Sequence, residues 1–225
     1  YVAYKDYNWM MDFVEEMLKT VAQAVNGTTK VNINGTEVDF GAEYRRLPML
    51  EAIKEYAGVD IEGMSEAELR ETCKKLHIEI DEKMGEGKLI DAIFGEYCEK
   101  HLIQPTFITD YPVSMSPLTK RHRSKPNLTE RFELFVCGKE LANAYSELND
   151  PIDQLARFED QLKLKDKGDD EAMYIDMDFV RALEYGMPPT SGMGIGIDRL
   201  TMFMTGQTTI QDVLFFPQMR PESYK

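Results

Sequence analysis

The amino-acid sequence predicts an α+β fold: an antiparallel sheet flanked by helices, with a small helical insertion. Two stretches carry this prediction. Residues 132–147 form two strand-like runs around a glycine turn, which is the pattern of a β-hairpin, and residues 192–197 alternate glycine with apolar residues, as a strand would. Elsewhere, apolar residues recur at helical spacing and end at glycine or proline stop signals.

Composition limits what the protein can do. The chain has 225 residues, 43% of them hydrophobic and 29% charged, which suits one large domain with ample core. A formal net charge of −14 excludes a nucleic-acid surface over the whole chain, because phosphate would be repelled. The cysteines lie far apart without a CxxC pair, so we expect no zinc site, no disulfide framework and a cytoplasmic location. No run is apolar enough to span a bilayer, so we expect no membrane partner.

Residues 1–58 are expected to form the first part of the core. The chain opens with an alternating aromatic run that leads into a helix, and Asn26-Gly27 ends this helix. Four apolar residues at helical spacing predict its buried stripe: Met10, Phe13, Met17 and Val21.

The next stretch changes from strands to short helices. Asn34-Gly35 is expected to form a type I′ turn between two short strands, and a short helix from Pro48 ends at Gly58. Residues 59–101 then read as a helical insertion with an acidic, solvated exterior. Within this insertion, Ser65-Glu-Ala-Glu68 is spaced as a capping box at the start of a helix.

Residues 102–225 are expected to form the second part of the core. They begin with a strand at 102–110, where Pro105 favours an edge position or a bulge, and Asp150-Pro151 starts a later helix. A basic cluster lies within residues 116–126. It would contact the phosphate of a nucleotide or an RNA end, or it is a solvated loop, and both interpretations stay open. Its cations are Lys120, Arg121, Arg123 and Lys125.

The predicted hairpin carries the first candidate site. Gly138-Lys139 fits a type II′ turn, because glycine accepts a positive φ. In the second strand Asn143, Tyr145 and Glu147 share one parity, so an amide, a phenol and a carboxylate can hold a small cationic ligand. The alternative is an edge strand with solvated polar residues. Glu140 should face the opposite side, unless a bulge re-aims it and lets it share a metal with Glu147.

The glycine-rich stretch carries the second candidate site. Gly192, Gly194 and Gly196 leave one strand face without side chains, so a flat ring such as adenine can lie against the backbone. Asp198 is expected to N-cap the following helix, with Arg199 in its first turn. A guanidinium beside a helix N-terminus is suited to polyphosphate. The alternative is tight strand packing and a surface arginine.

Together these stretches resemble the class II aminoacyl-tRNA synthetases, and among them the lysyl-tRNA synthetases. Residues 192–200 (GMGIGIDRL) resemble the third signature motif, with Arg199 as its arginine, and residues 140–150 (ELANAYSELND) resemble the segment specific to the lysine enzymes. The likeness runs from Tyr1 almost to the last residue, and the stretch at 59–101 falls where bacterial members carry an insertion. Shorter matches to the same subclass are Ser116-Pro-Leu118, Arg131-Phe-Glu133, residues 182–188 (ALEYGMP) and residues 212–217 (DVLFFP).

The resemblance implies that the lysine carboxylate attacks the α-phosphate of ATP to give lysyl-adenylate, which then acylates tRNA(Lys). It also implies Mg²⁺ as cofactor and a homodimer as the intact family's assembly. The implied ATP-binding residues are Arg199, Gly192, Gly194, Gly196 and Glu140, of which Arg199 is the catalytic one. The implied lysine-binding residues are Tyr1, Asn143, Tyr145 and Glu147, and the implied metal ligands are Glu140 and Glu147.

The match also has a departure from the family pattern. In the family, a dimerisation motif, an arginine-bearing second motif and an anticodon-reading OB-fold precede the point that Tyr1 matches. We therefore expect this chain, taken alone, to carry half of a catalytic site and to be inactive. Two other functions stay open: a ligase that joins lysine to a translation factor, and a non-catalytic module that binds lysine or a nucleotide.

Overall fold

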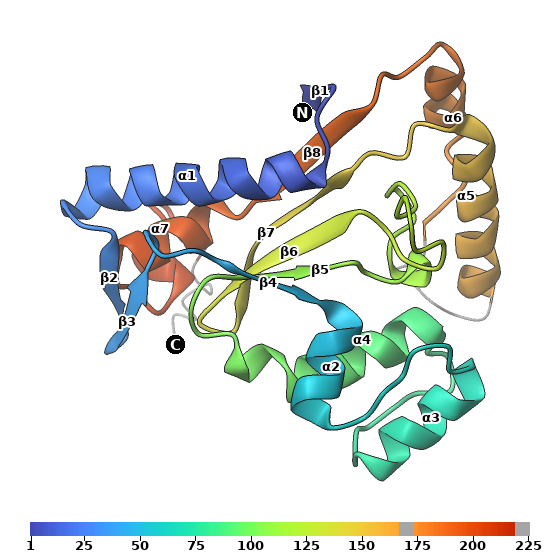
Figure 1. Ribbon diagram of the computed structural model, residues 1–225, viewed down its shortest axis with the longest axis horizontal. Coiled ribbons are helices and arrows are strands. Elements are labelled where there is room, and N and C mark those ends of the chain that lie inside the picture. Colours follow the sequence, from blue (N-terminus) through green and yellow to red (C-terminus); the bar gives the residue numbers. More distant parts are fainter. Residues whose placement is uncertain (167–172, 219–225) are drawn as a thin grey trace, which may run out of the picture.

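The computed structural model describes residues 1–166 and 173–218 and contains a six-stranded sheet flanked by helices (Figure 1). The strand order is β1-β8-β7-β6-β5-β4, and each neighbouring pair is antiparallel except β4 and β5. The predicted α+β class is confirmed, and the hairpin and the glycine-rich strand lie side by side in one sheet. The strands are β1 (Val2–Ala3), β4 (Arg45–Pro48), β5 (Thr106–Thr109), β6 (Arg131–Val136), β7 (Lys139–Ser146) and β8 (Thr190–Ile195).

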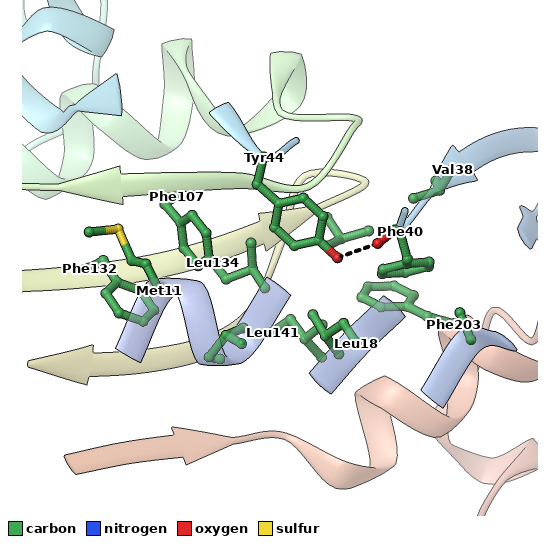
Figure 2. Close-up of a cluster of buried hydrophobic side chains, with 14 of the residues drawn as sticks. Met11, Leu18, Val38, Phe40, Tyr44, Phe107, Phe132, Leu134, Leu141 and Phe203 are labelled. Atoms are coloured by element: carbon green, nitrogen blue, oxygen red, sulfur yellow. Dashed lines mark hydrogen bonds between the residues drawn. The ribbon is translucent and has the colours of Figure 1, made fainter. Parts of the chain in front are cut away.

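One face of the sheet packs against α1 (Tyr7–Asn26), α7 (Ile197–Thr205) and a separate hairpin of β2 (Lys30–Ile33) and β3 (Thr36–Asp39). Figure 2 shows this first core, where apolar side chains of the sheet and of these elements interdigitate. At its edge, Tyr44 Oη donates a hydrogen bond to the carbonyl of Phe40 over 3.2 Å, so the buried phenol keeps a partner.

The buried stripe of α1 differs from the predicted one. Met10 is buried as predicted, but Phe13 is 43% exposed, and Met17 and Val21 are only partly buried. The helix carries apolar residues on two adjacent stripes, so spacing alone could not choose between them, and the position of the sheet selects the second. The residues that face the core are Tyr7, Met10, Met11, Val14, Leu18 and Ala22.

The other face is covered at one end by three helices, α2 (Met49–Ala57), α3 (Glu66–Lys75) and α4 (Glu86–Tyr97). Leu47, Ile108 and Phe135 point from β4, β5 and β6 into this second core. Of the described residues that form this core, none comes from β7 or β8. That part of the face is therefore open to polar side chains, and the candidate site lies there.

The remaining elements connect these layers. They are the short 3₁₀ turns η1 (Glu99–His101), η2 (Val113–Met115) and η3 (Ile210–Asp212), and the helices α5 (Pro151–Asp166) and α6 (Met177–Glu184). Both α3 and α4 fall within residues 59–101; that this range is an insertion between two parts of the core, 1–58 and 102–225, stays a prediction. No helix of the described chain is long and apolar enough to cross a membrane.

Several local signals have the predicted outcome. Gly27 and Gly58 cap α1 and α2 with φ values of 69° and 70°. Ser65 and Glu68 form the capping box of α3, since the Ser65 hydroxyl accepts from the Glu68 N–H and the Glu68 carboxylate accepts from the Ser65 N–H. Asn34 has a positive φ of 49°, as a type I′ turn requires.

Two details of the strands differ from prediction. The β6–β7 turn is Cys137-Gly138, with φ of 50° and 69°, rather than Gly138-Lys139, because β6 already ends at Val136. Two successive positive φ values belong to a type I′ turn, which matches the twist of the strands. β5 is an inner strand between β4 and β6, so Pro105 marks neither an edge nor a bulge. It precedes the first strand residue and removes no ladder bond.

Candidate functional site

Three polar side chains lie on one face of the sheet, as their parity predicts. Asn143 lies opposite Gly194, and Tyr145 lies opposite Gly192, in the β7–β8 ladder. Glu147 follows the strand, and its carboxylate lies over Gly192, in the space that a β-carbon there would need. An amide, a phenol and a carboxylate therefore border a strip of backbone that has no side chains of its own.

The carboxylate of Glu147 is half-buried, and this burial raises its pKa to about 7. No lysine or arginine side chain pairs with it in the part of the chain that the structure describes. Burial, together with the Glu147 charge, also raises the pKa of Tyr145 to about 12, so the phenol remains a hydrogen-bond donor at neutral pH. The ring of Tyr1 lies over Gly192 beside Glu147. The N-terminal ammonium lowers the pKa of Glu147 and so opposes burial, and a ligand ammonium beside the carboxylate would act in the same sense.

A β-bulge brings Glu140 to the same face. Along β6 the pairing is continuous, but its partners in β7 jump from Ala142 to Glu140, so Leu141 is an extra residue. Leu141 and Ala142 both pack into the first core. The alternation of side chains is therefore reversed beyond them, and Glu140 shares the face of Asn143. This is the condition under which the sequence allowed Glu140 to join the site.

The resemblance implies that Glu140 and Glu147 share a metal ion, and that pairing stays a prediction; the backbone places the two residues toward opposite ends of β7. Seven steps of nearly extended chain, shortened by the bulge, separate their backbones by at most about 23 Å at ~3.3 Å per residue. The carboxylate beside Glu140 is that of Glu133, which lies on the neighbouring strand opposite Asn143. Burial raises the pKa of Glu140, and the Glu133 charge raises it further.

Glu133 is the functional candidate that sequence reasoning missed. The signal was present, because Arg131 and Glu133 alternate with apolar residues, but only the β6–β7 register shows which face they share with Asn143. Glu133 Oε1 accepts hydrogen bonds from Arg131 Nη2 at 2.5 Å and from Asn143 Nδ2 at 3.1 Å. Its Oε2 accepts from the buried Tyr111 hydroxyl at 2.8 Å.

The carboxylates of Glu133 and Glu140 have the chemistry that Mg²⁺ requires. Within the described residues, no group of three or more His, Cys, Asp or Glu side chains could hold a metal ion. Mg²⁺ does not need such a group, since one or two carboxylates suffice when water and substrate phosphates complete its shell. The pair therefore fits a Mg²⁺ ion that arrives with a phosphate ligand.

Arg199 lies where the glycine-rich strand gives way to α7. The helix begins at Ile197 with Gly196 as N-cap, so Asp198 is inside the helix and is not the cap that the sequence predicted. The Arg199 guanidinium is exposed and donates to the backbone carbonyl of Glu140, which joins the start of α7 to β7. Arg199 thus lies beside Glu140, at the end of the face remote from Glu147.

The glycines differ in what lies over them. The space over Gly192 is filled by Glu147 and by the ring of Tyr1. Over Gly194 it is open, because the nearest atom to a β-carbon there would be a backbone oxygen 4.0 Å away. Gly196 has left the strand and begins the helix. The bare surface that a flat ring could cover is therefore centred on Gly194.

The basic cluster at residues 116–126 is used inside the protein. Each of its four cations donates to a group of the same chain, for example Arg123 Nε to the buried Glu130 at 2.6 Å. The four pairs are Lys120 with Asn149, Arg121 with Asp153, Arg123 with Glu130 and Lys125 with Asp110. These contacts favour a structural role for the cluster over phosphate binding.

A cavity of about 1160 Å³ opens beside the site. Its wall includes Tyr111, Arg131 and Glu133, together with residues of α4, η2 and α5. The hydrogen-bonded group around Glu133 is therefore reachable by a small molecule or by water.

Comparison with known proteins adds to this geometry. The family model described as class II tRNA synthetases (D, K and N) matches residues 1–220. The chain is 70% identical over 222 residues to the lysine–tRNA ligase of Porphyromonas gingivalis, which covers 99% of the chain and 38% of that relative. It is 67% identical to the lysine–tRNA ligase of Christiangramia forsetii and 64% identical to that of Azobacteroides pseudotrichonymphae, covering 39% and 44% of their lengths. The chain thus spans less than half the length of these curated relatives.

Proposed function

This chain belongs to the class II tRNA synthetases for D, K and N, and we propose from that premise that it provides the lysine- and phosphate-binding face of a lysine–tRNA ligase. In the proposed reaction, a carboxylate oxygen of lysine bonds to the α-phosphorus of ATP, and the bond to pyrophosphate breaks. A hydroxyl of the terminal ribose of tRNA(Lys) then bonds to the carbonyl carbon of the lysyl-adenylate, and AMP leaves. The attacking carboxylate is already ionised, so catalysis consists of alignment and of stabilising charge.

The half-buried Glu147 carries this proposal. A carboxylate that burial leaves partly protonated gains from a cation at close range, and the lysine ammonium is such a cation. Tyr145 and Tyr1 lie beside it, as walls for the four-carbon stem. Asn143 lies four residues before Glu147, about 13 Å along the strand, and long side chains narrow that span. The face therefore suits a ligand with an ammonium at one end and a carboxylate at the other.

ATP is proposed to lie at the other end of the same face. Arg199 would hold a phosphate, and the bare backbone at Gly194, the open one of the three glycines that the resemblance implies for ATP, would meet the adenine ring. Glu133 and Glu140 would hold Mg²⁺, which neutralises phosphate charge when bound. Burial, and after it the charge of Glu133, raises the pKa of Glu140, so a bound cation would favour the ionised form of this carboxyl.

The proposal includes the partners that the family implies: lysine, ATP and tRNA(Lys) as substrates, a homodimeric enzyme and a cytoplasmic location. The chain has a formal net charge of −14, and in its described part the cations at 116–126 are paired internally. We therefore expect this part of the protein to contact only the acceptor end of the tRNA.

The test is lysine-dependent exchange of labelled pyrophosphate into ATP, followed by transfer of labelled lysine to tRNA(Lys), with the protein as its gene encodes it. Lysine should support exchange at least about tenfold better than ornithine, which is one methylene shorter. Exchange without transfer to tRNA would favour the ligase that modifies a translation factor. Lysine binding without exchange would favour the non-catalytic module, and exchange that ignores lysine would refute the proposal.

A further inference from the structure

Arg131 occupies the middle of the site face, although nothing in its sequence motif assigns it a role. It begins β6, and its side chain is 15% exposed. The guanidinium lies 4.5 Å from the ring centre of the buried Tyr111. It donates to the Met115 carbonyl at 2.8 Å and to the Ser116 hydroxyl at 3.0 Å. These contacts hold it rigidly against the 113–116 segment.

The other two hydrogen bonds of Arg131 reach the site itself. Its Nε donates to Asn143 Oδ1 at 3.2 Å, and its Nη2 donates to Glu133 Oε1 at 2.5 Å. The same Glu133 oxygen accepts from Asn143 Nδ2 at 3.1 Å. Arg131, Glu133 and Asn143 thus form a closed triangle of hydrogen bonds on two neighbouring strands.

This triangle allows only one orientation of the Asn143 amide. A guanidinium can only donate, so the amide oxygen must face Arg131. A carboxylate paired with a guanidinium can only accept, so the amide nitrogen must face Glu133. Turning the amide over would set oxygen against carboxylate and N–H against guanidinium, at the cost of both bonds. Arg131 and Glu133 together therefore fix the side to which the Asn143 amide nitrogen points.

One N–H of the fixed amide is left without a partner in the triangle, and a ligand oxygen can accept from it. Across the ladder from Asn143 lies Gly194, which contributes no side chain and leaves room for a ligand. Resting on the proposed function, we propose that Arg131 is a positioning residue: it holds the Asn143 amide so that its free N–H meets the carboxylate of the amino-acid substrate. Arg131 acts through Asn143 and does not itself touch the substrate.

The proposal predicts different effects on the binding of lysine and of lysinol. Lysinol keeps both amines of lysine but has a hydroxymethyl group in place of the carboxylate. Arg131→Lys keeps a positive charge but cannot bridge Asn143 and Glu133 in the fork geometry of a guanidinium. Calorimetry in metal-free buffer should give Arg131→Lys a tenfold or greater loss of lysine affinity and at most a twofold loss of lysinol affinity.

Two comparisons identify how Arg131 acts. Ser116→Ala removes an anchor of Arg131 but leaves its bond to Asn143, so lysine affinity should stay within about twofold. In an Asn143→Ala background, Arg131→Lys should cost little further lysine affinity, because the residue through which it acts is gone. Additive losses in this double-mutant cycle, or equal losses for lysine and lysinol, would overturn the proposal.

A folding defect would not hide the answer. If Arg131→Lys loses its cooperative thermal transition, the isosteric Asn143→Asp variant tests the contact through which Arg131 acts, because it replaces the amide donor with an acceptor. It should lose lysine affinity at least tenfold more than lysinol affinity, and equal losses would count against the proposal. Failure of the unmodified protein to bind lysine at all would instead count against the proposed function.

Discussion

Glu147 and Gly192 compete for one volume: the Glu147 carboxylate fills the place where any residue other than glycine would put its β-carbon. The ring of Tyr1 reaches into the same place. The backbone of Gly192 is not in the left-handed region, so an alanine would be tolerated there on conformational grounds alone. Glycine is required at position 192 because Glu147 and Tyr1 occupy the space of a β-carbon. A substitution there therefore tests whether Glu147 belongs to the lysine pocket.

Gly192→Ala should weaken lysine binding by tenfold or more and leave ATP binding within about threefold, because the new methyl group displaces Glu147. Gly194→Ala is the matched control, since its β-carbon would have 4.0 Å of clearance. It should weaken lysine binding far less than Gly192→Ala does, because it leaves Glu147 in place, and it should weaken ATP binding, because the new methyl group lies where the adenine ring is proposed to pack. Calorimetry with each ligand measures both. Unchanged lysine affinity in Gly192→Ala would remove Glu147 from the pocket.

Lysine affinity should fall as the pH drops below about 7. The Glu147 carboxyl takes up a proton near that pH, and the protonated form offers no charge to an ammonium. Well below the pKa, each further pH unit should cost about tenfold in affinity. Calorimetry between about pH 5.5 and pH 8.5 checks this, with Glu147→Gln as the comparison. The Gln variant should bind weakly with a flat profile, and a profile as steep as the parent's would point to another titrating group.

Glu147→Gln should also raise thermal stability at alkaline pH. The pKa of Glu147 is higher in the folded chain than its ordinary value of 4.5, so between that value and about 7 the folded state holds more protons than the unfolded state. Stability therefore declines as the pH rises through this window, and the loss is complete above it. Because the carboxylate is only half-buried and solvent screens it, we expect a modest gain of about 2–4 °C at pH 8. Melting curves at pH 8 and pH 4 should show the gain at pH 8 only.

Removing either proposed metal ligand should weaken Mg²⁺ binding to the protein–ATP complex. Glu133→Gln and Glu140→Gln each remove one charge from the pair, and each should lower Mg²⁺ affinity by about tenfold. Glu147→Gln should leave it unchanged, since Glu147 lies at the other end of β7. Titrating Mg²⁺ into each variant with ATP present measures the effect. A loss in Glu147→Gln equal to that in Glu140→Gln would support the Glu140–Glu147 pairing that the resemblance implies.

Residues 1–225 by themselves should not catalyse lysine-dependent pyrophosphate exchange. On the described site face, Arg131 is fully engaged with its neighbours, which leaves Arg199 as the guanidinium that could contact ATP. Losing one preorganised donor typically slows an enzyme about 100–1000-fold, and a triphosphate needs several. The assay compares this chain with the protein as its gene encodes it. Exchange at a similar rate by both would mean that Arg199 and the metal pair suffice.

The sequence was a good guide wherever one local rule decides the structure. Turn and cap residues such as Asn34, Ser65 and Gly27 behave as predicted, because their effect depends on a few neighbouring atoms. Strand alternation placed Asn143 and Tyr145 on one face for the same reason.

Where a decision depends on distant partners, the sequence was silent or misleading. The apolar residues of α1 allow two stripes, and only the position of the sheet shows that Phe13 is left exposed. The side of Glu133 follows from the β6–β7 register, which no short window of sequence contains. Gly138 correctly predicted a turn, but the position of that turn depends on the residue at which β6 ends.

The extra residue Leu141 shifts the alternation of side chains along β7 by one position. In a regular strand, successive side chains point to opposite faces of the sheet. An inserted or deleted residue therefore moves every side chain beyond it to the other face. Here the bulge at Leu141 divides β7 into two segments. One places Glu140 on the site face, and the other places Asn143 and Tyr145 there. A single-residue deletion at Leu141 would turn Glu140 away from the face and leave the lysine-facing segment in register. The two halves of the site can therefore vary independently, one without dislocating the other.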